Sequence, residues 1–236
     1  MQNFLKMTFV GFLVMTSRLL FAQTDSIKEQ FTFTEFAAIK ASGIAHIYLT
    51  PGNQEKVEVE ANYKNIYGRL KMEVIDKVLN IRLESDRSSW SNNYKDVRLD
   101  IYITYKKLDR LEGSGAIRFY AENPIAAKQL DLKLSAASNS KLNLQVSTLK
   151  LEISGAAKVD LTGKAEQFMV QANGASRLQA NKLLAQEVKI EANGVSHNSI
   201  YAGKTLDMKA NGMSRIKHEG NARVTSKEVS RMANVD

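Results

Sequence analysis

Three histidines and a scattered set of carboxylates are the side chains with which this sequence could carry out metal or acid–base chemistry. The histidines are His46, His197 and His218. They form no HExxH pair and the chain has no cysteine, so neither a histidine metal site nor a cysteine-based site is expected. A G-x-S-x-G elbow, a P-loop and a dinucleotide fingerprint are also missing from the sequence. We therefore expect no cofactor and no catalytic residue.

Acidic residues in the C-terminal half are the candidates for glycoside chemistry. They include Asp131, Glu152, Glu191 and Asp207. Hydrolysis of a glycosidic bond needs two carboxylates at a defined separation, one of them with a raised pKa. Here lysines alternate with the acids, and a neighbouring cation lowers the pKa of a carboxyl group and keeps it ionised. We interpret these acids as surface ion-pair partners, with a β-helix polysaccharide lyase or hydrolase as the alternative function.

A set of basic residues recurs at a regular interval along the C-terminal half and could bind an anion. We call it the basic stripe, and its members are Arg118, Lys158, Arg177, His197 and Arg215. Asn139 fills one position of the series, and His46 holds the same place in an earlier copy. Stacked like charges repel unless an anion or solvent screens them. The stripe is either a solvated edge or a binding site for a glycan that carries uronic acid, sulfate or phosphate groups.

A recurring four-residue phrase must position these side chains. Its clearest copy is Ser154-Gly155-Ala156-Ala157, and the related phrases begin at Ser114, Ser135, Asn173, Asn193 and Asn211. The near-constant period of about 20 residues between successive phrases is typical of proteins that stack one small unit on the next. The glycine of each phrase predicts a corner with positive φ, and the three asparagines predict an amide ladder.

The residues before each phrase alternate between two kinds. Those one, three and five positions before it are apolar, as in Leu149, Leu151 and Ile153. They predict the buried face of a strand, because alternate residues of a strand share a face. The residues two and four positions before it are charged except at Gln171 and Met169, and two charges of one sign never adjoin from copy to copy, as in Lys133 and Glu152. Parallel coils about 4.8 Å apart would place these opposite charges side by side.

The N-terminal half carries its own copy of the phrase at Ser42-Gly43. The turn residues at 50–53 and the alternation over 57–61 predict a hairpin with the strand before them, and residues 97–105 predict a further half-buried strand. The predicted fold class is all-β: a parallel β-solenoid with coils of about 20 residues over 108–220, preceded by an irregular β region over 31–107. Together these form a single domain, and residues 221–236 form a C-terminal cap or tail.

Residues 1–22 of the 236-residue chain predict export. A positive Lys6, an apolar run and Ala22 before Gln23 are typical of a cleaved signal peptide, and residues 23–30 form a short polar leader. Cleavage leaves no transmembrane span and lowers the net charge from +8 to +6, because Lys6 and Arg18 are removed. Nucleic acid is not expected as a partner, since the chain is exported and lacks a Lys/Arg-rich run.

The phrases, the opening Phe36-x-x-Ile39-x-x-Ser42-Gly43 and the run over 149–156 resemble the head GIN domain of auto-transporter adhesins. This is an exported domain of unknown function from Bacteroidetes-type bacteria. The resemblance covers residues 31–219 and implies a β-helical fold at the cell surface or in the periplasm of a Gram-negative cell. It implies no activity and no functional residues. Since no translocator barrel follows the repeats, self-export is not expected.

These observations together predict a non-catalytic, adhesin-like binding module. An acidic polysaccharide or cell-surface glycan is the partner that the basic stripe would suit. A carrier of small apolar ligands is a weaker alternative, because the small alanines of the repeats indicate a filled interior.

Overall fold

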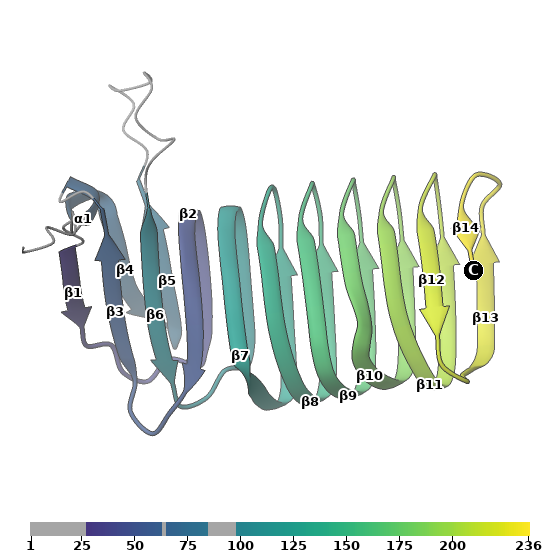
Figure 1. The fold of residues 1–236 in the computed structure, drawn as a ribbon, viewed down its shortest axis with the longest axis horizontal. Coiled ribbons are helices and arrows are strands. Elements are labelled where there is room, and N and C mark those ends of the chain that lie inside the picture. Colours follow the sequence, from purple (N-terminus) through teal and green to yellow (C-terminus); the bar gives the residue numbers. More distant parts are fainter. Residues whose placement is uncertain (1–26, 63–64, 85–97) are drawn as a thin grey trace, which may run out of the picture.

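The computed structural model describes residues 27–62, 65–84 and 98–236. The predicted signal peptide, the first half of the polar leader and the loop that carries Trp90 lie outside the described residues. The described strands form one 14-stranded sheet that winds into a solenoid (Figure 1), which confirms the predicted fold class. Within this described part, no helix has the length and apolar content that crossing a membrane requires.

Five long strands form the successive coils of the solenoid. They are β7 (Arg110–Leu134), β8 (Asn139–Ile153), β9 (Lys158–Ala172), β10 (Arg177–Ala192) and β11 (His197–Ala210). Each pairs in parallel with the next, so residues one repeat apart in the sequence become neighbours across the strands. Val170, Ile190 and Met208 are partners in three successive coils, as the alternation of apolar residues predicts.

The strands β8 to β11 each turn once at one edge of the molecule, and β7 turns at both edges, so every coil contributes an arm to each of two facing layers (Figure 1). The apolar columns fill the space between the layers: Leu149, Phe168 and Leu206, for example, are buried. Burial of each such side chain contributes about 1.5–3 kcal/mol to the hydrophobic stabilisation. We call the outer surface of the layer that carries the basic stripe the stripe face. The outer surface of the opposite layer, whose strand segments come directly before each phrase, is the ladder face.

The phrases form the corners at the opposite edge. Gly155, Gly174, Gly194 and Gly212 have φ between 69° and 75°, in the left-handed region that glycine adopts without strain. Each corner lies directly on the one before, and the backbone N–H of Ala175 donates to the carbonyl of Gly155 at 2.9 Å. Ala136 holds the equivalent place in the phrase at Ser135 and has a φ of 61°.

An amide ladder joins the three corners that begin with asparagine, as predicted. Asn193 donates through Nδ2 to Oδ1 of Asn173, and Asn211 donates in the same way to Asn193, both at 2.9 Å. Asn193 therefore both donates and accepts, and its side chain bridges two neighbouring coils.

The N-terminal copy of the phrase is itself a coil. It is β2 (Ala38–Pro51), which pairs in parallel with β7, Ser42 opposite Ser114 and Gly43 opposite Gly115. One arm of β2 pairs with β5 (Val78–Leu83), and β4 (Leu70–Ile75) covers the outer edge of β5. The other arm pairs with β6 (Leu99–Tyr105), followed by β3 (Lys56–Ala61) and β1 (Ile27–Phe31). The short helix α1 (Asn65–Arg69) precedes β4.

The predicted hairpin between the first strand and residues 57–61 is wrong. β6 lies between β2 and β3, parallel to β2 and antiparallel to β3. Its alternating apolar residues are in register with those of β2, Ile101 opposite Ile47 and Ile103 opposite Leu49. β6 therefore extends the core of the solenoid. The prediction failed because the turn signal at 50–53 is local and cannot indicate that a strand from farther along the chain inserts between β2 and β3.

The C-terminal residues form a last, shorter coil. β12 (Arg215–Glu219) and β14 (Asn234–Val235) continue one layer, and β13 (Arg223–Val229) pairs with β11 in the other. Lys227 stands opposite Met208, at a place that earlier coils fill with an apolar core residue. A charge at such a place discourages further strands from adding to the open edge.

Candidate functional site

The structure brings all residues of the basic stripe into one column on the stripe face. Successive strands pair Arg118 with Asn139, Asn139 with Lys158, Lys158 with Arg177, Arg177 with His197, and His197 with Arg215. His46 on β2 extends the column, because it pairs with Arg118. Lys158 is half-buried and the other four stripe residues are exposed.

Few carboxylates compensate the charge of the basic stripe. Lys158 forms an ion pair with Asp160, which follows it on the same strand, at 3.4 Å. Within the described part of the chain, no carboxylate lies within ion-pair distance of Arg118, Arg177 or Arg215. Because neighbouring strands lie about 4.8 Å apart, the cationic groups repel one another across the strands and favour an anion above the column.

A buried carboxylate fixes the N-terminal end of this column. Asp100 on β6 is fully buried and accepts hydrogen bonds from Nδ1 of His46 at 3.1 Å and from Nε of Arg98 at 2.6 Å. The hydrogen bond to Asp100 raises the pKa of the Arg98 guanidinium. Since Nδ1 of His46 donates to Asp100 and a guanidinium can only donate, Nε2 of His46 accepts a hydrogen bond from Arg118 at 3.2 Å. These bonds hold Arg118 at the start of the stripe.

Three tyrosines lie beside this end of the stripe on the same face. Tyr102, Tyr48 and Tyr120 come from neighbouring strands β6, β2 and β7 and are register partners. Their ring centroids are 4.9 and 5.2 Å apart and their planes differ by 15° and 20°, which is a stacked arrangement. Burial, followed by the charge of Asp100, raises the pKa of Tyr48 and Tyr102. Stacked rings of this kind stabilise the pairing of the strands that carry them.

Sequence reasoning missed both the buried Asp100 and the stack of tyrosines. A signal was present, because Tyr48 and Tyr120 each lie two residues after a member of the column, His46 and Arg118. Tyr102 belongs to β6, which is outside the repeats, so only the three-dimensional pairing brings it to the stack.

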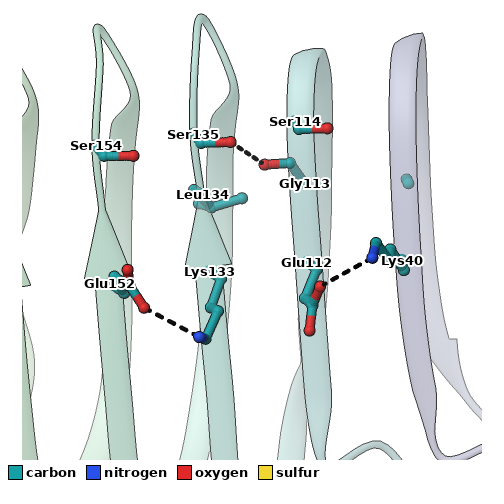
Figure 2. A pocket seen from close by; sticks show the side chains of 10 residues that line it. Lys40, Glu112, Gly113, Ser114, Lys133, Leu134, Ser135, Glu152 and Ser154 are labelled. Carbon is teal, nitrogen blue, oxygen red and sulfur yellow. Dashed lines mark hydrogen bonds and ion pairs between the residues drawn. The ribbon is translucent and has the colours of Figure 1, made fainter.

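The ladder face has a different charge pattern. A hollow of about 230 Å³ lies there over the first coils, and Figure 2 shows Lys40 directed at Glu112 and Lys133 directed at Glu152 across neighbouring strands. The two ion pairs are 3.9 and 3.1 Å long. Ser135 donates to the carbonyl of Gly113 at 3.5 Å beside them. Glu112 and Glu152 are therefore partners of lysines, as the alternation of charges predicts. Asp131 and Glu191 on the same face instead accept hydrogen bonds from the side-chain amides of Gln129 and Asn193.

Further along the ladder face, Lys189 pairs with Asp207 at 3.6 Å and Lys209 with Glu228 at 3.5 Å. Among the described residues, no three His, Cys, Asp or Glu side chains are grouped in a way that could hold a metal ion. The basic stripe thus repeats charge of one sign from coil to coil, whereas the ladder face carries charge that is largely paired.

Several solved structures share this fold. A protein described as a putative adhesin from Bacteroides fragilis is 23% identical, with a TM-score of 0.78 over 89% of this chain and 95% of that one. Another putative adhesin, from Parabacteroides merdae, is 18% identical, with a TM-score of 0.65 over 89% and 95%. A protein described as a putative lipid binding protein from Parabacteroides distasonis is 16% identical, with a TM-score of 0.63 over 89% and 96%. At these identities the likeness shows the fold alone.

No curated protein matches the sequence. The family model described as "Putative auto-transporter adhesin, head GIN domain" matches residues 35–222, which are most of the chain and include every coil from β2 to β12. Neither this family nor the three solved relatives is described as an enzyme. The chain therefore belongs to the head GIN domain family of auto-transporter adhesins.

Proposed function

We propose that this protein is a non-catalytic, adhesin-like module that holds an acidic glycan along the basic stripe. The observation that carries the proposal is the contrast between the two faces. Charges on the ladder face alternate and pair, as at Lys133 and Glu152, whereas the stripe repeats positive charge at Arg118, Arg177 and Arg215. Repetition of one sign costs stability, and a polyanion that spans the column offsets that cost.

The length of the stripe fits an extended chain. Arg118 and Arg215 are five strand steps apart, which corresponds to about 24 Å at a spacing of about 4.8 Å. A polysaccharide whose acidic groups repeat along its length can meet several cations at once, and linked contacts raise the overall affinity. Because the cations are exposed to solvent, we expect binding to weaken as salt screens them.

Export to the periplasm or the outer surface of a Gram-negative cell belongs to the same proposal. The apolar, cation-led residues 1–22 and the membership in an adhesin family support it. N-terminal sequencing of the exported form should give a start near Gln23. Recovery of the chain from the cytosol with Met1 intact would contradict this part of the proposal.

Retention on an acidic polysaccharide tests the function. The mature chain should be retained on immobilised polygalacturonate and on heparin at low salt. Combined replacement of three stripe residues, Arg118→Ser, Arg177→Ser and Arg215→Ser, should abolish retention while leaving the fold intact, because exposed cations contribute little to stability. The matched control replaces Lys128, Lys150 and Lys164 with serine: these three lysines are exposed, lie outside the stripe and carry the same total charge.

The outcomes separate the alternatives. Loss of retention in the stripe variant alone supports the proposal, whereas equal loss in both variants means that only net charge matters. Release of reducing ends or unsaturated products would show an enzyme instead. Binding to vesicles of anionic phospholipid without retention on either polysaccharide would show a lipid-binding surface.

A further inference from the structure

A second hollow lies on the stripe face beyond the N-terminal end of the basic stripe. It has a volume of about 470 Å³, within the range of small-molecule sites. Three strands line it: β1 with Lys28 and Gln30, β3 with Glu58 and Glu60, and β6 with Tyr102. Cross-strand pairing sets Gln30 opposite Glu58, and Glu58 opposite Tyr102, so these three side chains form one row across the hollow.

Tyr102 lines this hollow with a partly exposed aromatic ring. One side of its ring stacks on Tyr48, which lies on the strand away from β3. The other side therefore faces β3 and the hollow, and Tyr102 is 38% exposed. Tyr48, the middle ring, has Tyr102 on one side and Tyr120 on the other. Only the end rings of the stack can receive a ligand, and of these Tyr102 lines the hollow.

The polar side chains of the hollow suit hydroxyl groups better than charges. Glu58 pairs with Lys56 at 2.9 Å and Glu60 with Lys28 at 3.3 Å, so ion pairs within the protein already use both carboxylates. An ionised carboxylate offers about four acceptor positions, so Glu58 retains capacity for hydrogen bonds from hydroxyls. The Gln30 amide supplies both donors and an acceptor. Glutamates at this place repel the acidic groups that the basic stripe would attract.

The neighbouring hydrogen bonds hold the aromatic wall in place. Asp100, two residues before Tyr102 on β6, is buried and is bound by both His46 and Arg98. The stack itself restrains the Tyr102 ring from its other side. An aromatic face that is ordered before binding loses little conformational entropy when a ligand packs on it.

We infer that this hollow is a subsite for an uncharged pyranose ring, with the apolar face of the sugar on Tyr102 and its hydroxyls on Glu58 and Gln30. The inference rests on the proposed function in one respect, that the ligand is a glycan. The inference goes beyond the proposed function because it places a neutral sugar unit next to the acidic units of the glycan. The hollow and the basic stripe lie on the same face. Contact with the stripe depends on charge, whereas contact with this subsite depends on packing and hydrogen bonds.

Affinity gel electrophoresis of the mature chain in gels that contain α-mannan, dextran or mixed-linkage β-glucan tests this subsite. At least one of these uncharged polysaccharides should retard the protein, and the effect should persist at about 0.5 M salt, where charge contacts are screened. Tyr102→Thr should weaken the retardation about tenfold, because it removes the aromatic face but keeps a residue with high β propensity. Tyr102→Phe should retain it, since the ring remains.

Tyr120→Thr is the matched control, because it removes the ring at the opposite end of the same stack and leaves the hollow unchanged. Its retardation should equal that of the unmodified chain. The triple serine variant of the basic stripe should also bind the neutral polysaccharide normally, so failure of the stripe proposal leaves this result intact. The inference is overturned if none of the three polysaccharides retards the protein, or if Tyr120→Thr weakens the retardation as much as Tyr102→Thr.

Discussion

Replacement of Gly174 by alanine tests the corner geometry on which the stacking of coils depends. A Cβ atom at this position would lie 2.9 Å from the carbonyl oxygen of Gly155 in the preceding coil and 3.1 Å from its nitrogen. Gly174 has a φ of 72°, where a residue with a Cβ loses about 1–2 kcal/mol. The contact with backbone atoms destabilises the fold by a further 1–3 kcal/mol, roughly, through overpacking. Alanine also makes the unfolded chain stiffer than glycine does, which stabilises the fold by about 0.5–1 kcal/mol. We expect a net loss of about 3 kcal/mol.

Urea unfolding followed by far-ultraviolet circular dichroism measures this loss as a lower midpoint at an unchanged slope. Gly68→Ala is the matched control. Gly68 lies in α1 and a Cβ there would have no neighbouring atom within 4 Å, so alanine should stabilise by about 0.5–1 kcal/mol. Ala136→Gly is the reverse change and should raise the midpoint, because Ala136 holds the same left-handed conformation. No measurable loss in Gly174→Ala, or destabilisation by Ala136→Gly, would refute the argument from corner geometry.

Three further changes should follow from the same structure. Burial raises the pKa of Tyr105 to about 12 from 10.0, so the unfolded chain loses this proton first. The free energy of unfolding should therefore fall by on the order of 2 kcal/mol between pH 10 and 12. Tyr105→Phe should lack that loss in alkaline unfolding curves, and an identical pH dependence would contradict it. Asn193→Ala should lower the free energy of unfolding in urea by about 1–2 kcal/mol, because the variant loses hydrogen bonds to two neighbouring coils. An unchanged urea midpoint would mean that the amide ladder does not stabilise the fold. Arg177→Ser should leave the melting temperature level or slightly higher, since it relieves repulsion by Lys158 and His197, and a clear decrease would count against the like-charge column.

The coils could be predicted from the sequence because two independent patterns define the same register. The constant period of the phrases identifies the equivalent positions, and a slip to the next residue would turn the apolar set of Leu149, Leu151 and Ile153 outward. The alternation of charges adds a constraint across strands, and ion pairs such as Lys133 with Glu152 follow it. The basic stripe could be found for the same reason, since its members share one place in the repeat.

The N-terminal end could not be predicted in the same way. β6 and β3 lie outside the repeats, and their partners are chosen by contacts between segments far apart in the sequence. His46 and Asp100 are 54 residues apart, and the outward position of Asp100 in an alternating strand predicts exposure rather than burial. The hollow beside Tyr102 arises only after β1, β3 and β6 have assembled, so no local pattern indicates it.

The direction of the hydrogen bonds has a mechanical consequence. The coils are set side by side along the long axis, with β1 at one end and the C-terminus at the other (Figure 1), so the bonds between strands run along that axis. A tether that pulls on both ends loads these bonds one coil at a time, because each coil touches only its neighbours. Every coil that detaches releases about 19 residues, or about 65 Å of chain at full extension. Under tension we therefore expect stepwise lengthening from the terminal coils, which would let the chain dissipate a sudden pull while its inner coils stay folded.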